Sequence, residues 1–428
     1  MHLREAITTM ARQARDASRR LAELSAPQKS LCLRAMANAL DERAVDLLAA
    51  NQTDLDAAAQ AGLSPALLDR LRLDRRRIAA MTRGLREISD LPDPVGRILD
   101  NRIRPNGLRL QKVSTPIGVI VVIYESRPNV TADAAGLCFK SGNATLLRGG
   151  KEALHSNRLI TEILTEAGRR RVPSFPEHAI QLVPTTDRDA IPILLSLTEY
   201  IDLCMPRGGE GLIRAVTDCS KVPVIKHYKG VCHVYVDRAA DLKMAERIVL
   251  NAKCQRPGVC NAMETLLLDR PIAAPFLVHL APALAALSVE IRADIEASQL
   301  LAPPNAPPYP KLRTATEQDW YTEYNDLILN LRVVDTVAAA IAHVTQYGSA
   351  HSDAIVTSDE PTAQQFLARV DSAAVYWNAS TRFTDGAEFG MGAEIGISTD
   401  KIGARGPMGL EELTSYKWIG FGTGQVRT

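Results

Sequence analysis

The sequence lacks the cysteine pattern that disulfide-bonded and zinc-stabilised proteins require. Its seven cysteines, an odd number, are scattered along 428 residues without a CxxC pair, and its eight histidines form no ligand cluster near them. Disulfide frameworks and structural zinc sites depend on paired or regularly spaced cysteines. We therefore expect neither a disulfide nor a bound metal, and a reducing cytoplasm as the compartment of the protein.

Long apolar runs and an excess of one charge are also missing. No stretch approaches the roughly 20 apolar residues of a membrane-spanning helix, and residues 1–10 lack the apolar core of a signal peptide. Fifty Lys and Arg residues balance 49 Asp and Glu residues, for a net charge of +1. This balance gives no electrostatic basis for binding nucleic acid or a membrane surface.

What the sequence contains is typical of a globular protein of two or three domains, given a prior of roughly 150 residues per domain. Residues 25–55 carry apolar side chains at helical spacing, with Ser25 as a cap and Pro27 in the first turn, and residues 64–88 continue this pattern. Two prolines and a glycine within residues 91–96 then interrupt it.

Short apolar runs alternate with helical patterns after that point. The first series comprises residues 118–124, 144–148, 179–183, 201–205 and 222–226. The second series comprises residues 233–237, 263–269, 327–334, 353–357 and 373–377. Runs that are apolar on both faces and joined by helical crossovers indicate parallel sheets. The predicted fold class is therefore α/β, with two doubly wound domains in tandem.

Two segments fit neither sheet. Residues 106–116 alternate like an exposed ribbon, and residues 414–424 place large apolar groups close to the C-terminus. Such arms commonly pack against a neighbouring subunit, although a local hairpin within one chain is the alternative. The proline-rich stretch 301–310 is expected to be a surface loop without chemistry.

The glycine-rich GxGxxG fingerprint of dinucleotide-binding proteins is absent, because residues 420–425 have the wrong spacing and no helix after them. Arg-Gly-Gly occurs instead at 148–150 and at 207–209, each time between a strand and a helix. The N–H groups at such a helix start favour an anion. One such loop can be an ordinary turn, whereas two in one sheet predict a phosphate-rich cofactor.

Cys260 is the best candidate for a nucleophile. It lies in the Pro-Gly loop of "QRPGVCNAMET" (255–265), next to Arg256 and to backbone amides that could stabilise a thiolate. The alternative, a small buried apolar residue, suits Cys32, Cys138, Cys204 and Cys219 better.

The segment "KCQRPGVCNAMETLL" (253–267) resembles the catalytic segment of the gamma-glutamyl phosphate reductase family, within the aldehyde dehydrogenase superfamily. The resemblance extends from about residue 112 to the C-terminus through "PIGVIVVIYESRPNVTADAAGLCFKSGNATLLRGGKEA", "MPRGGEGLI", "VPVIKHYKGVCHVYVD" and "NASTRFTDGAEFGMGAEIGISTDKIGARGPMGLEELTSYKWIG". It implies an NADPH-binding domain formed by residues 1–98 and 117–231, a catalytic domain at 232–403, and an oligomerisation arm formed by 99–116 and 404–428.

The resemblance also implies an activity. NADPH would reduce L-glutamyl 5-phosphate to L-glutamate 5-semialdehyde, the second step of proline biosynthesis, through a thioester on Cys260 and with release of phosphate. The backbone amide of Cys260 and the side chain of Asn129 would stabilise the oxyanion. An ungapped match to the wider superfamily places its oxyanion Asn nearer Glu125 instead. Where aldehyde-oxidising relatives carry a hydrolytic Glu, this chain offers His227 or a neighbour and no acid.

Further roles carry over by position. The residues implied for the cofactor, NADPH or NADP⁺, are Arg148, Lys151, Arg207, Gly208, Gly209 and Glu323. Those implied for the anionic groups and hydroxyl contacts of the substrate are Arg127, Arg256, Ser380, Thr381 and Arg382, with Asp385 or Glu125 for its ammonium group.

The resemblance implies a homodimer or larger homo-oligomer, and association with glutamate 5-kinase is a further hypothesis. Three alternatives remain open from the sequence. One is an acylating aldehyde dehydrogenase of the same fold that uses coenzyme A, and another is a hydrolase or amidotransferase built on Cys260. The third is a non-catalytic binding protein.

Overall fold

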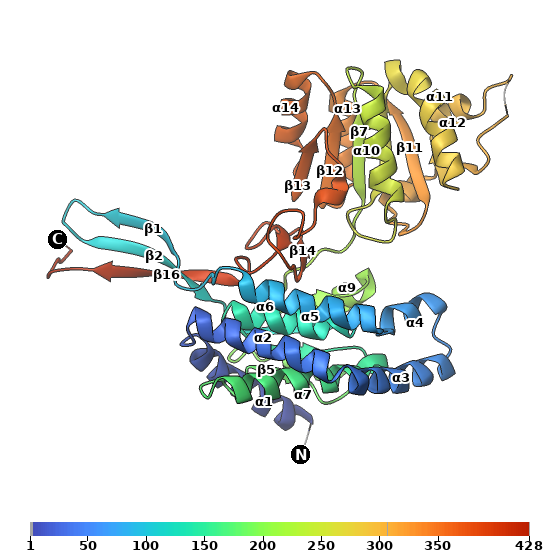
Figure 1. Ribbon diagram of the computed structural model, residues 1–428. Helices are drawn as coiled ribbons and strands as arrows, with labels where there is room; N and C mark the ends of the chain where they lie inside the picture. Colours follow the sequence, from blue (N-terminus) through green and yellow to red (C-terminus); the bar gives the residue numbers. More distant parts are fainter. Residues whose placement is uncertain (1–2, 306, 428) are drawn as a thin grey trace. The chain divides into compact units, whose positions relative to one another are not determined.

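The computed structural model describes residues 3–305 and 307–427, and these residues divide into two compact units (Figure 1). The first unit contains the described residues up to Lys226, together with Gly390–Gly396 and those from Met408 onward. The second unit contains His227–Phe389 and Ile397–Pro407. Each unit is built around its own parallel sheet.

Helices dominate the first unit. They are α1 (Leu3–Leu21), α2 (Ala26–Glu42), α3 (Ala44–Gln60), α4 (Pro65–Leu71), α5 (Arg75–Asp90), α6 (Asn129–Lys140), the 3₁₀ turn η1 (Lys151–Ala153), α7 (Leu154–Arg171), α8 (Ala190–Leu194) and α9 (Glu210–Cys219). Ser25 caps α2 as predicted, because its backbone N–H donates to Gln28 Oε1 at 2.9 Å in a capping box, and Pro27 lies in the first turn. Helix α2 packs against both α5 and α7.

The sheet of the first unit has the order β5-β4-β3-β6, with all neighbours parallel. Its strands are β3 (Val119–Tyr124), β4 (Ala144–Arg148), β5 (Ile180–Leu182) and β6 (Leu203–Arg207). All six residues of β3 are buried, and Val119, Val121 and Ile123 share a core cluster with residues of α1. Strands buried on both faces explain the continuous apolar runs in the sequence.

The prediction of a strand at residues 222–226 is wrong. Only an isolated bridge between Cys204 and Val224 forms there. Pro223 has no N–H to donate, so this segment cannot build a regular ladder with β6. Two hydrogen bonds remain, from Cys204 N to the Pro223 carbonyl at 2.9 Å and from Ile225 N to the Cys204 carbonyl at 3.1 Å.

The second unit contains a seven-stranded parallel sheet with the order β10-β9-β11-β8-β7-β12-β13. Its strands are β7 (Cys232–Val236), β8 (Met263–Asp269), β9 (Glu290–Ala293), β10 (Leu312–Thr314), β11 (Ile328–Val334), β12 (Ser352–Val356) and β13 (Ala374–Trp377). Its helices are α10 (Leu242–Cys254), α11 (Arg270–Ala286), α12 (Ile295–Leu301), α13 (Val337–Tyr347) and α14 (Glu360–Arg369), with 3₁₀ turns η2 (Glu317–Tyr321) and η3 (Thr381–Phe383).

Helices cover both faces of this sheet. One apolar cluster joins the sheet to α10 and α11 through residues such as Val249 and Phe276, and another joins it to α13 and α14 through Ile341 and Phe366. The two parallel, helix-covered sheets confirm the predicted α/β class. Strands β9 and β10 are additional to the prediction, because four-residue and three-residue strands leave too short an apolar run to recognise.

A third sheet is antiparallel and belongs to the first unit. It has the order β1-β2-β16 and consists of β1 (Ile98–Ile103), β2 (Arg109–Pro116) and β16 (Thr414–Phe421), which form a long ribbon (Figure 1). Three of its aromatic side chains, Tyr416, Trp418 and Phe421, are exposed, and each lies under a Lys or Arg side chain. Two short strands, β14 (Gly396–Ser398) and β15 (Gly406–Met408), form a separate pair.

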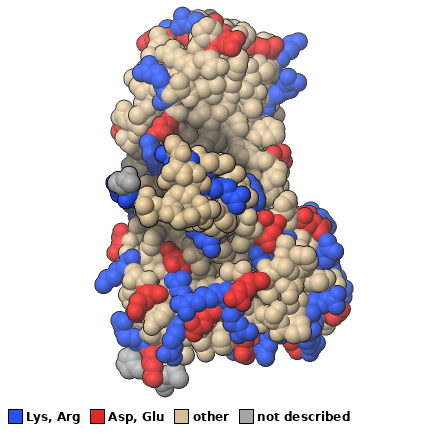
Figure 2. Space-filling model, turned by 90° about the vertical axis from the view of Figure 1, so that its left-hand side faces the viewer, with Lys and Arg blue, Asp and Glu red and all other residues tan. Residues whose placement is uncertain are grey.

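Surface charge agrees with the composition. Acidic and basic side chains are interspersed on the face drawn in Figure 2. Among the described residues, no helix combines the length and the apolar character needed to cross a membrane.

Candidate active site

Cys260 lies in a loop between α10 and β8, at the amino end of the sheet of the second unit. Its side chain is partly exposed, whereas Cys32, Cys138, Cys204 and Cys232 are buried. Burial raises the pKa of both Cys32 and Cys138 to about 12. These two thiols therefore stay protonated at neutral pH, as expected of structural cysteines.

The segment from Ser380 to Thr384 fixes the loop of Cys260. The carbonyl of Asn261, the next residue, accepts a hydrogen bond from Thr381 Oγ1 at 2.8 Å, and Asn261 Nδ2 donates to the Thr384 carbonyl at 2.8 Å. Arg382 donates to the Asn261 side chain and, through Nε, to Gln255 Oε1 at 2.9 Å. The hydroxyl of Thr381 is thus already engaged in holding the loop.

Gly230 lies directly against the backbone of Cys260. A Cβ atom at position 230 would stand 1.8 Å from the carbonyl oxygen of Cys260, a distance that real Cβ atoms do not show. The same carbonyl accepts a hydrogen bond from the Cys232 thiol at 3.3 Å. The sequence "KGVC" (229–232) therefore fits only because residue 230 has no side chain.

Two histidines stand next to Cys260. One ligand atom each from His227, Cys260 and His351 lie within 4.8 Å of one another, and the two imidazole rings meet edge to face with centroids 5.5 Å apart. Burial, and then the nearby His227, lower the pKa of His351 to about 3, so that its ring is neutral. The expectation that no histidines gather near a cysteine is wrong.

Sheet topology explains this cluster. His227, Cys260 and His351 each come shortly before a strand, namely β7, β8 and β12. These strands are neighbours in the order β8-β7-β12 and run parallel, so their amino ends meet at one edge. The three residues are far apart in the sequence, so their proximity could be predicted only from the order of the strands in the sheet.

A positively charged side chain, Arg382, lies within electrostatic range of the thiol. Burial lowers the pKa of the Arg382 guanidinium, and repulsion from Arg256 lowers it further, whereas attraction to Asp385 and Cys260 opposes the change. Arg256 is exposed, and Ser380 accepts a hydrogen bond from Arg382 N at 3.3 Å. Arg382 is therefore within electrostatic range of both Arg256 and the thiol of Cys260.

Glu323 is half-buried in the same unit and lies within electrostatic range of Glu264. Burial raises the pKa of Glu264 to about 7, although the Lys253 ammonium, 2.7 Å away and equally buried, opposes this rise. The pair connects the elements on either side of the loop, because Lys253 lies in the last turn of α10 and Glu264 belongs to β8. It anchors the two elements between which Cys260 stands.

Five of the six predicted cofactor residues lie at or just after the carboxyl ends of β4 and β6 in the first unit, whereas Glu323 belongs to the second unit. Glu125 Oε2 accepts a hydrogen bond from Gly209 N at 3.0 Å, at the start of α9. A Cβ at Gly208 would stand 2.6 Å from the same oxygen. The backbone after β6 therefore forms an anion-binding turn, and a carboxylate of the chain already lies in it.

Arg148 ends β4 and is almost completely buried. Its two terminal nitrogens donate to the carbonyls of Gly149 and Thr186 at 2.9 and 3.1 Å, while its buried Nε has no partner among the described residues. Burial lowers the pKa of this guanidinium. Lys151 is exposed three residues further on. An unsatisfied buried donor beside an exposed cation suits a phosphate-bearing cofactor, so the residues fit a dinucleotide.

Asn129 begins α6, and Arg127 is exposed just before it. Asn129 Nδ2 donates to Asp133 Oδ2 at 3.0 Å, one turn along the helix. Burial raises the pKa of Asp133 to about 6, although this hydrogen bond and the positive charge of Arg207 oppose the rise. Asp133 therefore orients the side-chain amide of Asn129 by accepting one hydrogen bond from its Nδ2 atom.

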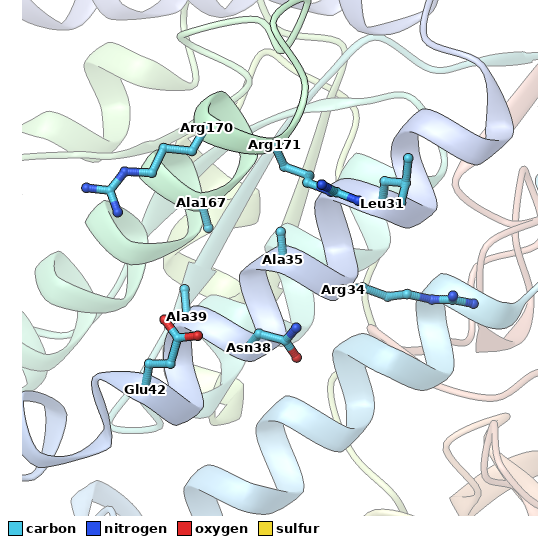
Figure 3. A pocket seen from close by; sticks show the side chains of 9 residues that line it. All are labelled: Leu31, Arg34, Ala35, Asn38, Ala39, Glu42, Ala167, Arg170 and Arg171. Carbon is cyan, nitrogen blue, oxygen red and sulfur yellow. The ribbon is translucent and has the colours of Figure 1, made fainter.

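A groove between α2 and α7 contains none of these residues. Figure 3 shows its lining, in which Arg34 and Arg170 point in different directions. Arg34 is paired with Asp90 at 2.7 Å and Arg170 with Glu166 at 2.5 Å. Because acidic side chains of the protein neutralise these two cations, we do not propose this groove as the active site.

The fold agrees with comparisons to known proteins. The model of the aldehyde dehydrogenase family matches residues 2–300. An acetylating aldehyde dehydrogenase from Geobacillus thermoglucosidasius, 18% identical, has a similar fold, with a TM-score of 0.68 over 100% of this chain and 98% of that one. The chain belongs to the aldehyde dehydrogenase family, and the predicted aldehyde dehydrogenase-like fold is confirmed.

Similarity is much higher to one group within this family. A gamma-glutamyl phosphate reductase from Moorella thermoacetica is 54% identical over 421 residues, or 98% of each chain. The crystal structure of gamma-glutamyl phosphate reductase from Thermotoga maritima is 43% identical, with a TM-score of 0.94 over 99% of this chain and 100% of that one. The chain is a member of the gamma-glutamyl phosphate reductases, as its motifs predicted.

Proposed function

We propose that the chain catalyses the NADPH-dependent reduction of L-glutamyl 5-phosphate to L-glutamate 5-semialdehyde, with release of phosphate, in proline biosynthesis. The observation that carries this proposal is the setting of Cys260. Its partly exposed thiol stands in a fixed loop within electrostatic range of Arg382, and two histidines lie beside it. The names of relatives that align over nearly the whole chain support the choice of substrate.

Cys260 acts as the nucleophile. Its thiolate attacks the carbonyl carbon of the acyl phosphate, the bond from that carbon to the phosphate oxygen breaks, and phosphate leaves a glutamyl thioester on sulfur. Attraction between Cys260 and Arg382 favours the thiolate. The backbone N–H of Cys260 and the amide of Asn129, oriented by Asp133, are the donors proposed for the oxyanion.

NADPH, when bound, supplies the hydride that turns the thioester carbonyl into a hemithioacetal. Arg148 and Lys151 are proposed to hold the 2′-phosphate, and the turn of Arg207, Gly208 and Gly209 to approach the pyrophosphate. Glu125 must then release the Gly209 amide, which it binds at 3.0 Å. Collapse of the hemithioacetal returns the thiol of Cys260 and frees the aldehyde. The carboxylate of Glu323 is proposed to bind the nicotinamide ribose.

Three arginines are proposed to bind the anionic ends of the substrate. Arg382, within electrostatic range of the thiol and of Arg256, is proposed to bind the phosphate together with Arg256, and Arg127 is proposed to bind the carboxylate. Ser380 and Thr381 are proposed as substrate contacts through their backbone, since the Thr381 hydroxyl already donates to the Asn261 carbonyl.

The most direct experiment runs the reaction backward. L-glutamate 5-semialdehyde, phosphate and NADP⁺ should yield NADPH continuously, and leaving out phosphate should stop turnover after the first thioester forms. Cys260→Ala should abolish the reaction, whereas Cys254→Ala, at another partly exposed thiol, should leave it intact. Continuous turnover with coenzyme A but not with phosphate would favour the acylating alternative, and turnover with neither would indicate hydrolysis by water.

We extend the proposal to the domains, the subunit contacts, the compartment and a partner enzyme of the protein. The domain division by function follows the boundaries given from the sequence, and the ribbon β1-β2-β16 joins subunits of a homodimer or larger homo-oligomer through its exposed aromatic side chains. The reaction is proposed to take place in a reducing cytoplasm, because the seven cysteines lack the paired spacing of a disulfide framework. Glutamate 5-kinase is the proposed partner enzyme, because an acyl phosphate is short-lived in water.

A further inference from the structure

The cluster of His227, Cys260 and His351 has a property that acyl transfer does not require. Nucleophilic attack by Cys260 needs one thiolate and donors for an oxyanion. Two imidazole rings within 4.8 Å of the same sulfur exceed that need. One nitrogen from each ring together with a thiolate is a ligand set that binds zinc in proteins.

Hydrogen bonds fix which nitrogen of each ring carries the proton. His227 Nδ1 lies 2.9 Å from the carbonyl oxygen of Ile397, which can only accept, so Nδ1 carries a proton and in the neutral ring Nε2 has the lone pair. Ser352 Oγ donates to Thr384 Oγ1 at 2.6 Å and therefore accepts from His351 Nδ1, 2.8 Å away. His351 Nε2 is thus the nitrogen with the lone pair too.

His351 Nε2 is also an unsatisfied buried atom. It has no hydrogen-bond partner among the described residues, although the side chain is fully buried. Buried polar atoms without partners are rare and call for an explanation. A histidine that ligates zinc donates its other ring N–H to a carbonyl or hydroxyl-type oxygen, which orients the lone pair toward the metal. Both histidines of the cluster have this arrangement.

The dimensions of the cluster suit a zinc ion after a small adjustment. Tetrahedral bonds of about 2.0–2.1 Å to nitrogen and about 2.3 Å to sulfur place the ligand atoms about 3.5 Å apart. The atoms here lie within 4.8 Å of one another, and both His227 and Cys260 are only partly buried. Side-chain rotations at these two residues can therefore close the remaining gap, with a water molecule as fourth ligand.

We propose that His227, Cys260 and His351 form a binding site for Zn²⁺ that reversibly blocks the nucleophile. As the sulfur–zinc bond forms, the thiol proton passes to solvent and no electrons are transferred. A thiolate that shares a lone pair with the metal is a weaker nucleophile, and the bound ion obstructs its approach to an acyl carbon. Binding of the ion is independent of the function proposed above, whereas the inhibition of reduction rests on it.

Binding is tested on the full-length protein without substrate. Competition with a chromophoric zinc chelator should give one tightly held Zn²⁺ per chain, and Co²⁺ in its place should show a sulfur-to-cobalt charge-transfer band. Loss of one ligand should weaken zinc binding by about tenfold or more, since even outer-shell changes cost about 10–100-fold. The variants are Cys260→Ser and His227→Gln, with His351→Gln as a third that is more liable to misfold because the residue is buried.

Matched controls are Cys254→Ser and His279→Gln, a partly exposed thiol and an exposed imidazole that should leave zinc binding unchanged. Retention of full zinc affinity by Cys260→Ser or His227→Gln, or absence of the cobalt–thiolate band in the wild type, overturns the site. The inhibition arm is separate: added Zn²⁺ should stop reductase turnover and a chelator should restore it. Zinc bound by an inactive protein would refute the proposed function and leave the metal site intact.

Discussion

Gly230→Ala tests whether the backbone position of Cys260 controls activity. The added Cβ would lie 1.8 Å from the carbonyl oxygen of Cys260, while real Cβ atoms keep at least 3.0 Å, so one backbone must shift by about 1.2 Å. A displacement of about 1 Å at a reacting group can cost about 100-fold in rate. We therefore expect kcat/KM of the phosphate-dependent reverse reaction to fall by about 100-fold.

The fold should survive this change, because the contact concerns one loop. Circular dichroism should be that of the wild type, and alkylation of Cys260 by iodoacetamide should slow in parallel with turnover. Gly211→Ala is the matched control, since a Cβ there meets nothing within 4 Å and the residue lies in α9. If the Gly230→Ala enzyme had the kcat/KM of the wild type, activity would not depend on the backbone position of Cys260, and the reasoning would be refuted.

The remaining predictions concern reactivity and stability. Iodoacetamide at neutral pH should label Cys260 first, as read by peptide mass spectrometry, and faster labelling of a buried cysteine would contradict the assignment. Asp133→Asn should raise the melting temperature above pH 6 and not at pH 4. The folded-state pKa of about 6 exceeds the unfolded value of about 3.9, so wild-type stability falls by up to about 3 kcal/mol as pH rises through this window. Lys253→Met should destabilise the protein by about 3–5 kcal/mol, because it leaves Glu264 buried without its partner. Adding Glu264→Gln should recover most of that loss in a denaturant titration, and no recovery would contradict the account of the pair.

Much of the fold could be predicted because buried parallel strands leave continuous apolar runs. Residues 144–148 and 263–269 were predicted with the bounds that the structure gives to β4 and β8. The errors have local causes. Pro223 prevents a ladder at residues 222–226, and β9 alternates Glu290 and Arg292 with buried residues over only four positions.

The candidate site could be predicted only in part. Cys260 was identifiable from its loop, and the Arg-Gly-Gly turns from their place between strand and helix. The side chains that lie next to Cys260 and next to the Arg-Gly-Gly turns could not be predicted, because they come from distant segments of the chain. Glu125 bound to Gly209 and His351 beside Cys260 both depend on strand order, which the sequence does not state.

The central claim, that the acyl group passes through the sulfur of Cys260, is tested most directly by trapping the thioester. Protein mixed with L-glutamate 5-semialdehyde and NADP⁺, without phosphate, should release one equivalent of NADPH per chain and gain the mass of one glutamyl group. Digestion should place that group on Cys260, and added phosphate should remove it. A burst without any adduct, or an adduct on a different residue, would contradict the account.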